Sequence, residues 1–399
     1  MEDTKPSETT REQTLRGPVI KVMGLGGGGS NAVDRMIELG IPGVEFIAAN
    51  TDYQVLQTSQ APVKIQLGPQ LTRGLGAGGV QEVGYQAARE SRREIEAALQ
   101  GADMVFLTAG MGGGTGTGAI SVAGEVARSL GAVTIAVVTM PFSFEMGRRQ
   151  KNAQEGLARL QAHTDTLIAI PNDRLLFVAP QDLPLETAFR LADDVLRQGV
   201  QGIAELVTQP GLINVDFAHV RNLMKRGGGA LMAIGHGTGD NKVVDAIEQA
   251  LQHPLLESVA LDDAKGVIAN FSGGEDLSLY EVGEAIGHIR GMISDDVDVV
   301  MGLSQDDRMR ERAQVILVVT GLGAKSLADV LPGAERLAEA GAIKSESTGK
   351  QAAPDTKPSG PAVIEESREA PPVDILNDLD VPAFLRKRAR VNAQVPERA

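Results

Sequence analysis

The strongest constraint on this chain is a glycine-rich stretch, GMGGGTGTG, at residues 110–118. The apolar residues 104–109 before it predict a buried strand, and the pattern from residue 119 onward predicts a helix. Glycines let main-chain amides approach an anion closely, and a helix start adds unpaired N–H groups. The hydroxyls of Thr115 and Thr117 add further donors. This stretch therefore predicts a phosphate site rather than a flexible linker.

A second glycine-rich turn, GLGGGGSN at residues 24–31, follows a predicted strand at 19–23 and precedes a predicted helix at 32–39. It contains G-x-G-x-x-G with the acidic residues Glu45 and Asp52 roughly 20 residues further on, so an NAD-dependent oxidoreductase is a rival interpretation. The P-loop pattern G-x-x-x-x-G-K-S/T is absent from the sequence. Two such turns in one domain favour a polyphosphate held from two sides.

Composition excludes several classes of function. The chain has no cysteine and five histidines, which excludes disulfides and Cys-ligated zinc and disfavours a histidine metal cluster. Its net charge of −14 opposes nucleic-acid binding. An acidic protein that holds a polyanion must rely on main-chain amides, a few placed cations and Mg²⁺. No apolar run is long enough to cross a membrane, so we expect a cytoplasmic protein without direct membrane insertion.

Alternating strands and helices predict an α/β fold with a parallel sheet covered by helices on both faces. A long helix is predicted at 185–208, followed by a smaller α/β domain. Predicted strands lie at 19–23, 44–49, 104–109, 133–139 and 166–170, then near 230–234, 266–271, 297–301 and 315–320.

Residues 344–372 are rich in Pro, Ser, Thr, Glu and Lys, which predicts a disordered linker. The following Asp374–Arg388 is acidic first, apolar in the middle and basic last. A frayed terminus is one interpretation, and a peptide that docks in a partner's groove is the other.

These residues resemble one family. GMGGGTGTG looks like the tubulin signature, and the chain resembles the FtsZ family of cell-division GTPases from about residue 19 to 321 and again at 378–388. The resemblance implies binding of GTP and GDP, head-to-tail polymerisation, and a contractile ring at the septum. It further implies membrane-tether and division-regulator proteins as partners of Asp374–Arg388, and a place at the division site.

The resemblance also implies site residues. Phosphate contacts fall on one side to Gly27, Gly28, Gly29, Ser30 and Asn31, and on the other to Gly114, Thr115 and Gly116. Glu145 and Arg149 match positions near the ribose and phosphates, whereas Asn172, Phe189 and Asp193 match positions at the guanine. No metal ligand is assigned.

In this family a loop after the central helix enters the next molecule's site and positions the attacking water. Asn214 and Asp216 match that loop, but His219 stands where the family usually has a second Asp. Because an imidazole that is mostly neutral at pH 7 carries no such negative charge, we expect slow turnover. A polymerising scaffold with little turnover is the alternative.

The resemblance divides the chain as follows: a disordered arm at 1–16, a GTP-binding domain at 17–184, the central helix at 185–208, the catalytic loop and connection at 209–225, an activation domain at 226–325, the end of the folded core at 326–343, the linker at 344–372, the partner-binding peptide at 373–390 and a tail at 391–399.

Overall fold

The computed structural model describes residues 17–145, 147–176, 182–208, 215–226, 228–253, 256, 264–294 and 296–322. All of them belong to the first of two units, which spans 1–347. The predicted arm at 1–16 and the segments predicted from 326 onward lie outside the described residues.

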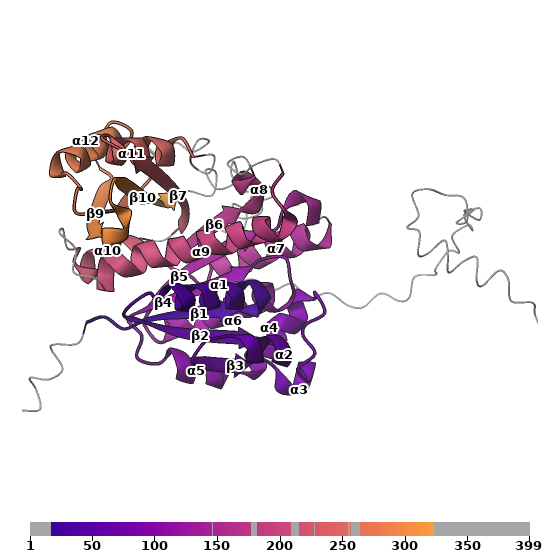
Figure 1. The fold of residues 1–399 in the computed structure, drawn as a ribbon. Helices are drawn as coiled ribbons and strands as arrows, with labels where there is room; N and C mark the ends of the chain where they lie inside the picture. The colour runs from indigo at the N-terminus through magenta and orange to yellow at the C-terminus, as the bar shows by residue number, and fades with distance from the viewer. Residues whose placement is uncertain are drawn as a thin grey trace, which may run out of the picture. The chain divides into compact units, whose positions relative to one another are not determined.

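A ten-stranded sheet runs through the described residues in the order β3-β2-β1-β4-β5-β6-β7-β10-β8-β9 (Figure 1). The first six strands in this order are parallel, and β10 lies antiparallel to both β7 and β8. The strands are β1 Ile20–Leu25, β2 Val44–Asn50, β3 Val63–Gln66, β4 Met104–Gly110, β5 Val133–Met140, β6 Thr166–Pro171, β7 Gly228–Thr238, β8 Gly266–Gly273, β9 Asp298–Gln305 and β10 Arg312–Leu322.

Helices cover both faces of this sheet, as the sequence predicts. The sheet has a hydrophobic core on each face. In β4, Val105 and Leu107 pack into one core and Phe106 into the other, because successive side chains of a strand point to opposite faces. The helices are α1 Gly26–Leu39, α2 Tyr53–Thr58, α3 Pro69–Thr72, α4 Gln81–Glu90, α5 Arg92–Leu99, α6 Thr115–Ser129, α7 Arg148–Gln161, α8 Asn172–Leu175, α9 Leu185–Thr208, α10 Phe217–Lys225, α11 Lys242–Leu251 and α12 Leu279–Arg290.

Helix α9 connects the two halves of the sheet. The predicted bounds of 185–208 match the structure because apolar residues recur at three and four along the buried face. A Cβ on Gly199 would lie 2.9 Å from the Met232 sulfur and 3.3 Å from Val137, which belong to different halves. The β6–β7 pairing, limited to three register pairs, gives the second link between the halves.

The two glycine-rich turns differ from the sequence prediction. Helix α1 begins at Gly26 rather than at residue 32, and α6 begins at Thr115 rather than at residue 119. Both helices start earlier because glycines fit where the chain leaves the sheet: a Cβ on Gly24 would lie 2.3 Å from the carbonyl oxygen of Gly29. Much of each predicted loop is thus the first turns of a helix.

A matched pair of glycines tests this packing. Gly84 in α4 is buried, and a Cβ there would lie 2.2 Å from the carbonyl oxygen of Gly114, just before α6. Gly283 in α12 is exposed, with nothing within 4 Å of such a Cβ. We expect Gly84→Ala to lower the free energy of unfolding by about 1–3 kcal/mol. Gly283→Ala should raise it by about 0.5–1 kcal/mol. Chemical denaturation measures both, and equal effects would contradict the packing argument.

Candidate functional site

The carboxyl ends of β1 and β4 lie next to each other, and each strand leads directly into a helix. No side chain caps the start of α1, which follows Leu25, or of α6, which follows Gly114. The first amide groups of both helices therefore remain available to a ligand, at the positive ends of two helix dipoles. This arrangement is suited to an anion.

The two helix starts are packed against each other without side chains between them. Gly26 has a φ of +71°, which favours glycine, and a Cβ there would lie 2.8 Å from the amide nitrogen of Gly116. A Cβ on Gly116 would lie 2.9 Å from the carbonyl oxygen of Leu25. Only glycine fits either position without a shift of the main chain.

The two threonines differ in their roles. The Thr117 hydroxyl is buried and accepts a hydrogen bond from the Gly112 amide at 2.8 Å, so it stabilises the turn, and its prediction as a ligand donor is wrong. The Thr115 hydroxyl faces the cavity region and lies 2.5 Å from that of Thr51. Asn152, to which sequence analysis gave no role, donates to the Gly112 carbonyl at 3.2 Å and supports the same turn.

A cavity of about 370 Å³ opens in front of these helix starts. Most of the predicted site residues line it: Gly27, Gly28, Asn31, Gly114, Thr115, Gly116, Glu145, Arg149, Asn172, Phe189 and Asp193.

Gly29 and Ser30 are not among the lining residues. Gly29 packs on β4, where a Cβ would lie 2.3 Å from the Thr108 carbonyl oxygen, and the Ser30 side chain is buried. The lining further includes Gly26, Met111, Thr139 and Pro141, to which the sequence gave no individual role. The rule that loops after parallel strands meet at one edge was the available signal for them.

Aromatic and polar side chains form the other end of the cavity. Phe189 contacts Phe142 edge to face, with ring centroids 5.5 Å apart, and its own ring is partly exposed. Glu145 pairs with Arg149 and accepts a hydrogen bond from the Phe142 amide. The Oδ1 atom of Asn172 is buried and has no hydrogen-bond partner among the described residues. This end offers a surface for a planar ring together with an unused acceptor.

Asp193, on α9, lines the same cavity as Asn172. Burial raises the pKa of its carboxyl to about 6, and the attraction of Arg35 opposes that shift. At pH 7 the group is still mostly ionised, so a second acceptor faces the cavity. Two neighbouring acceptors select a ligand that presents adjacent donors.

The predicted catalytic residues do not line this cavity. Asp216 caps α10, where its carboxylate accepts from the Ala218 amide at 3.0 Å, and His219 lies in the first turn of that helix. Asn214 lies outside the described residues. Figure 1 shows α8 near the start of α9 and α10 beside its end, and α9 is roughly 36 Å long at 1.5 Å per residue. Asp216 and His219 are thus near the opposite end of α9 from the cavity.

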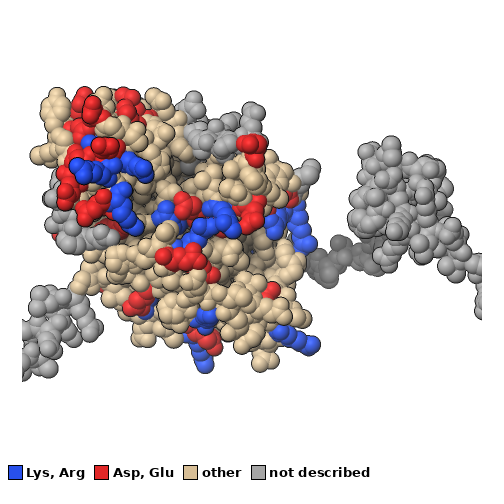
Figure 2. Space-filling view, viewed as in Figure 1, with Lys and Arg blue, Asp and Glu red and all other residues tan. Residues whose placement is uncertain are grey.

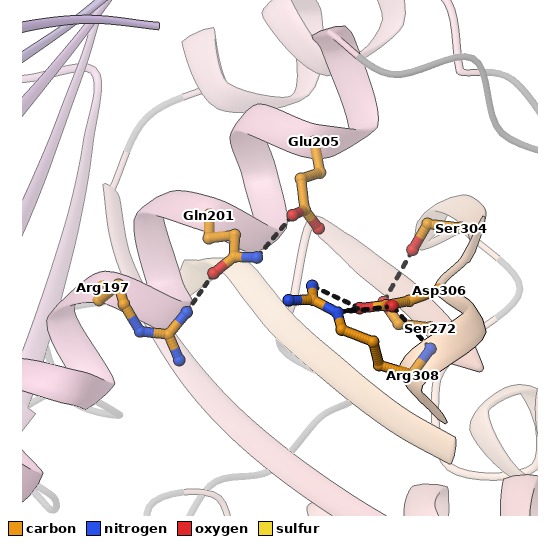
Figure 3. A network of polar contacts seen from close by, with 7 residues as sticks. All are labelled: Arg197, Gln201, Glu205, Ser272, Ser304, Asp306 and Arg308. Carbon is orange, nitrogen blue, oxygen red and sulfur yellow. Dashed lines mark hydrogen bonds and ion pairs between the residues drawn. The ribbon is translucent and has the colours of Figure 1, made fainter. Parts of the chain in front are cut away.

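A larger cavity of about 520 Å³ lies between α9 and the β9–β10 connection. Figure 3 shows Arg197, Gln201 and Glu205 hydrogen-bonded in a row along α9, facing the Asp306–Arg308 ion pair. Burial raises the pKa of Glu205. Carboxylates and guanidiniums here already have partners in the protein, whereas the smaller cavity presents uncapped helix starts and the unused Asn172 oxygen. We therefore assign the ligand site to the smaller cavity, despite its size.

Charged side chains of both signs lie beside one another along α9 in Figure 2.

Among the described residues no group of three or more His, Cys, Asp or Glu side chains could hold a metal ion. Within the same ranges, no helix combines the length and hydropathy that crossing a membrane requires.

Two family models match the chain. The GTPase domain of the Tubulin/FtsZ family matches residues 19–180, and the C-terminal domain of the FtsZ family matches residues 228–323. Both matches fall on the strand-rich halves that α9 connects.

Solved structures that are similar to this chain agree with these two family matches. An empty FtsZ dimer from M. jannaschii is 43% identical, with 79% of this chain and 93% of that chain covered and a TM-score of 0.74. A point mutant of M. jannaschii FtsZ is 44% identical, with 79% and 94% covered and a TM-score of 0.76. A GTPγS-bound protofilament of CetZ2 from Haloferax volcanii shares the fold at 20% identity, with 82% and 99% covered and a TM-score of 0.68.

The buried carboxyl gives a stability prediction. Because the folded chain holds the Asp193 proton up to about pH 6 and an unfolded chain releases it near its ordinary pKa of 3.8, the ligand-free protein loses stability as pH rises between these values. We expect Asp193→Asn to raise the free energy of unfolding by about 1–3 kcal/mol at pH 7.5, with the gain shrinking toward pH 4. Urea unfolding at both pH values measures this. A gain of equal size at both would show that the carboxylate charge is not the cause.

Proposed function

Because this chain belongs to the FtsZ family and is a GTPase, we propose that it polymerises head to tail with GTP and forms the contractile ring at the septum of a dividing cell. The oxidoreductase reading of the first glycine motif is wrong, since that motif lies within the Tubulin/FtsZ GTPase domain. The observation that carries the proposal is the pair of uncapped, glycine-packed helix starts in front of one cavity.

The phosphates of GTP would bind at the starts of α1 and α6. Gly27 and Gly28 present amides from one side, and Gly114, Thr115 and Gly116 from the other. The N–H groups and the helix dipoles supply positive potential to a protein whose net charge is −14. Since no group of three or more His, Cys, Asp or Glu side chains among the described residues could hold a metal ion, phosphate oxygens and water would supply most of the Mg²⁺ ligands.

The base would bind at the other end of the cavity. An ionised Asp193 accepts from N1–H and the exocyclic amine of guanine, a donor pair that adenine lacks. Asn172 adds its unused Oδ1, and the exposed face of Phe189 lies beside the ring. Glu145 and Arg149 would face the ribose and phosphates.

Hydrolysis would need a second subunit. Asp216 and His219, with Asn214 outside the described residues, would enter the site of the next molecule and position the attacking water. Their distance from their own cavity supports this arrangement. Relatives associate with themselves: the M. jannaschii structure is a dimer and the CetZ2 structure is a protofilament. His219 in place of an acidic residue favours a slow enzyme, and in the limit a scaffold with little turnover.

The segment Asp374–Arg388 would dock with a membrane-tether protein and with division regulators. Since the described residues include no helix suited to crossing a membrane, attachment would go through such partners. In this arrangement the chain would lie in the cytoplasm, at the division site.

Asp216 gives the direct test of a shared site. We expect Asp216→Ala to nearly abolish GTP turnover while its affinity for GTP stays unchanged. Asp216→Asn keeps an oxygen to cap α10 and should be equally inactive, which separates chemistry from helix stability. Phosphate release and calorimetric titration with GTP measure the two properties.

Mixing completes that test. Asp193→Ala should lose GTP affinity, yet its intact α10 can serve the GTP-filled cavity of an Asp216→Ala subunit. The mixture should therefore turn over GTP faster than the sum of the two variants. No gain on mixing, or lost affinity in Asp216→Ala, would mean that Asp216 serves its own subunit.

His219 gives a separate prediction. A carboxylate at this position supplies the negative charge that an imidazole lacks, so His219→Asp should raise phosphate release per subunit. Sedimentation with GTP serves as the control, since assembly should change less than turnover. Unchanged or slower release at equal assembly would refute the idea that this substitution slows the chain.

A further inference from the structure

His219, Asp298 and Arg226 form an ion cluster near the opposite end of α9 from the proposed GTP cavity. The proposed function gives a role to His219 but none to Asp298 or Arg226. The imidazole Nε2 of His219 lies 3.8 Å from Oδ1 of Asp298, the first residue of β9. The other carboxylate oxygen of Asp298 accepts from Nη2 of Arg226 at 3.0 Å. Helix α10 and strand β9 are in contact, so a single carboxylate receives groups from both ends of α10.

Arg226 fixes the position of the Asp298 carboxylate independently of His219. Arg226 directs one oxygen of Asp298, and its other terminal nitrogen donates to the main-chain oxygen of Lys265 at 3.4 Å. The Asp298 side chain is 30% exposed and that of His219 is 59% exposed. A separation of 3.8 Å is an ion-pair contact rather than a hydrogen bond. A small rotation of this exposed imidazole would bring Nε2 within hydrogen-bond distance of Asp298.

A carboxylate beside one ring nitrogen determines which nitrogen carries the proton. A neutral imidazole that donates Nε2–H to Asp298 leaves Nδ1 as an acceptor. In that tautomer the free acceptor is directed away from β9.

We propose that Asp298 is a positioning residue for GTP hydrolysis: it holds His219 so that Nδ1 accepts a hydrogen bond from the attacking water in the next subunit's site. This inference rests on the proposed function, in which α10 serves a neighbouring GTP. The carboxylate that the family has on α10 is absent at His219, and β9 supplies one behind the imidazole instead.

The step balances with GTP and water alone. The water oxygen forms a bond to the γ-phosphorus while the bond from that phosphorus to the β–γ bridging oxygen breaks. The water proton moves to Nδ1 of His219, and Asp298 stabilises the resulting imidazolium. GDP and phosphate leave, and the imidazolium then releases its proton to solvent.

The attraction between His219 and Asp298 would be stronger at the subunit interface than in the free chain. An exposed ion pair contributes little because water screens it. A neighbouring subunit that covers α10 removes that water, so the attraction between imidazolium and carboxylate increases where hydrolysis takes place.

Asp298→Asn in two backgrounds tests the proposal. In the wild-type chain this change should lower kcat for GTP roughly 10-fold, less than the ~10²–10⁴-fold that a general base itself contributes, because Asp298 acts only through His219. In His219→Asp, where residues 219 and 298 would both carry a negative charge, the same change should leave kcat unchanged or raise it. A purely structural role for Asp298 predicts a loss in both backgrounds, and that result would overturn the proposal.

Asp296→Asn is the matched control, because it removes an exposed carboxylate two residues away and should leave kcat unchanged. Sedimentation with GTP and thermal unfolding should be recorded for each variant, so that kcat is compared at equal assembly and stability. A loss in Asp296→Asn equal to that in Asp298→Asn would show that net charge rather than the His219 contact matters, and would also overturn the proposal.

The pairing has a signature that needs no catalysis. Nitrogen-15 shifts of the His219 imidazole, recorded in the full chain below its assembly concentration, should report the Nε2–H tautomer in the wild type and a loss of that preference in Asp298→Asn. An equal tautomer preference in both would overturn the proposal. If instead Asp216→Ala retained full turnover, the shared-site function would fail while the tautomer result stood independently.

Discussion

The close contact between two helix starts is the constraint on which the rest of the structure depends. Gly26 and Gly116 approach so closely that a Cβ on Gly26 would lie 2.8 Å from the Gly116 amide, and this contact brings α1 and α6 to one point of the sheet edge. Since neither helix has a side-chain cap, the amides of both converge on the same cavity. Two dipoles and several main-chain donors are thus fixed at the helix starts, and Arg149 adds a cationic side chain to the cavity lining. An acidic chain gains an anion site in this way, at no cost in surface charge.

Helix α9 links that site to the rest of the molecule. Its first half carries Phe189 and Asp193 to the cavity, and its second half packs on the C-terminal strands. Gly202 lets the helix approach β10, because a Cβ there would lie 2.6 Å from the Ile316 side chain, and its carbonyl accepts from buried Asn270 at 3.1 Å. A shift of α9 would therefore disturb packing in both halves. The cavity and α10, near opposite ends of one packed helix, are held in fixed relation.

Features that depend on local periodicity could be predicted from the sequence. Strand and helix alternation gave the parallel sheet, and the apolar repeat gave α9 with both of its ends. Most of the cavity residues followed from the resemblance and from the rule that parallel strands end at one edge. The short strand β3 did not, since Val63–Gln66 has only one buried residue. The role of Thr117 was also missed, because its partner amide at Gly112 depends on how the turn folds back on itself.

The ion cluster of His219, Asp298 and Arg226 likewise could not be predicted from the sequence. The sequence motif shows only that position 219 lacks an acidic residue, and this alone predicts slow GTP turnover. The fold brings a carboxylate from β9 to 3.8 Å from the His219 imidazole, and no sequence pattern connects that strand to α10. Charge in a site is set by which groups share a volume, and in the proposed arrangement the Asp298 carboxylate lies behind an imidazole that takes the proton a carboxylate at position 219 would take directly. In the proposed arrangement the negative charge lies one side chain behind position 219, so the fold as well as the motif determines which charges act on the reacting groups.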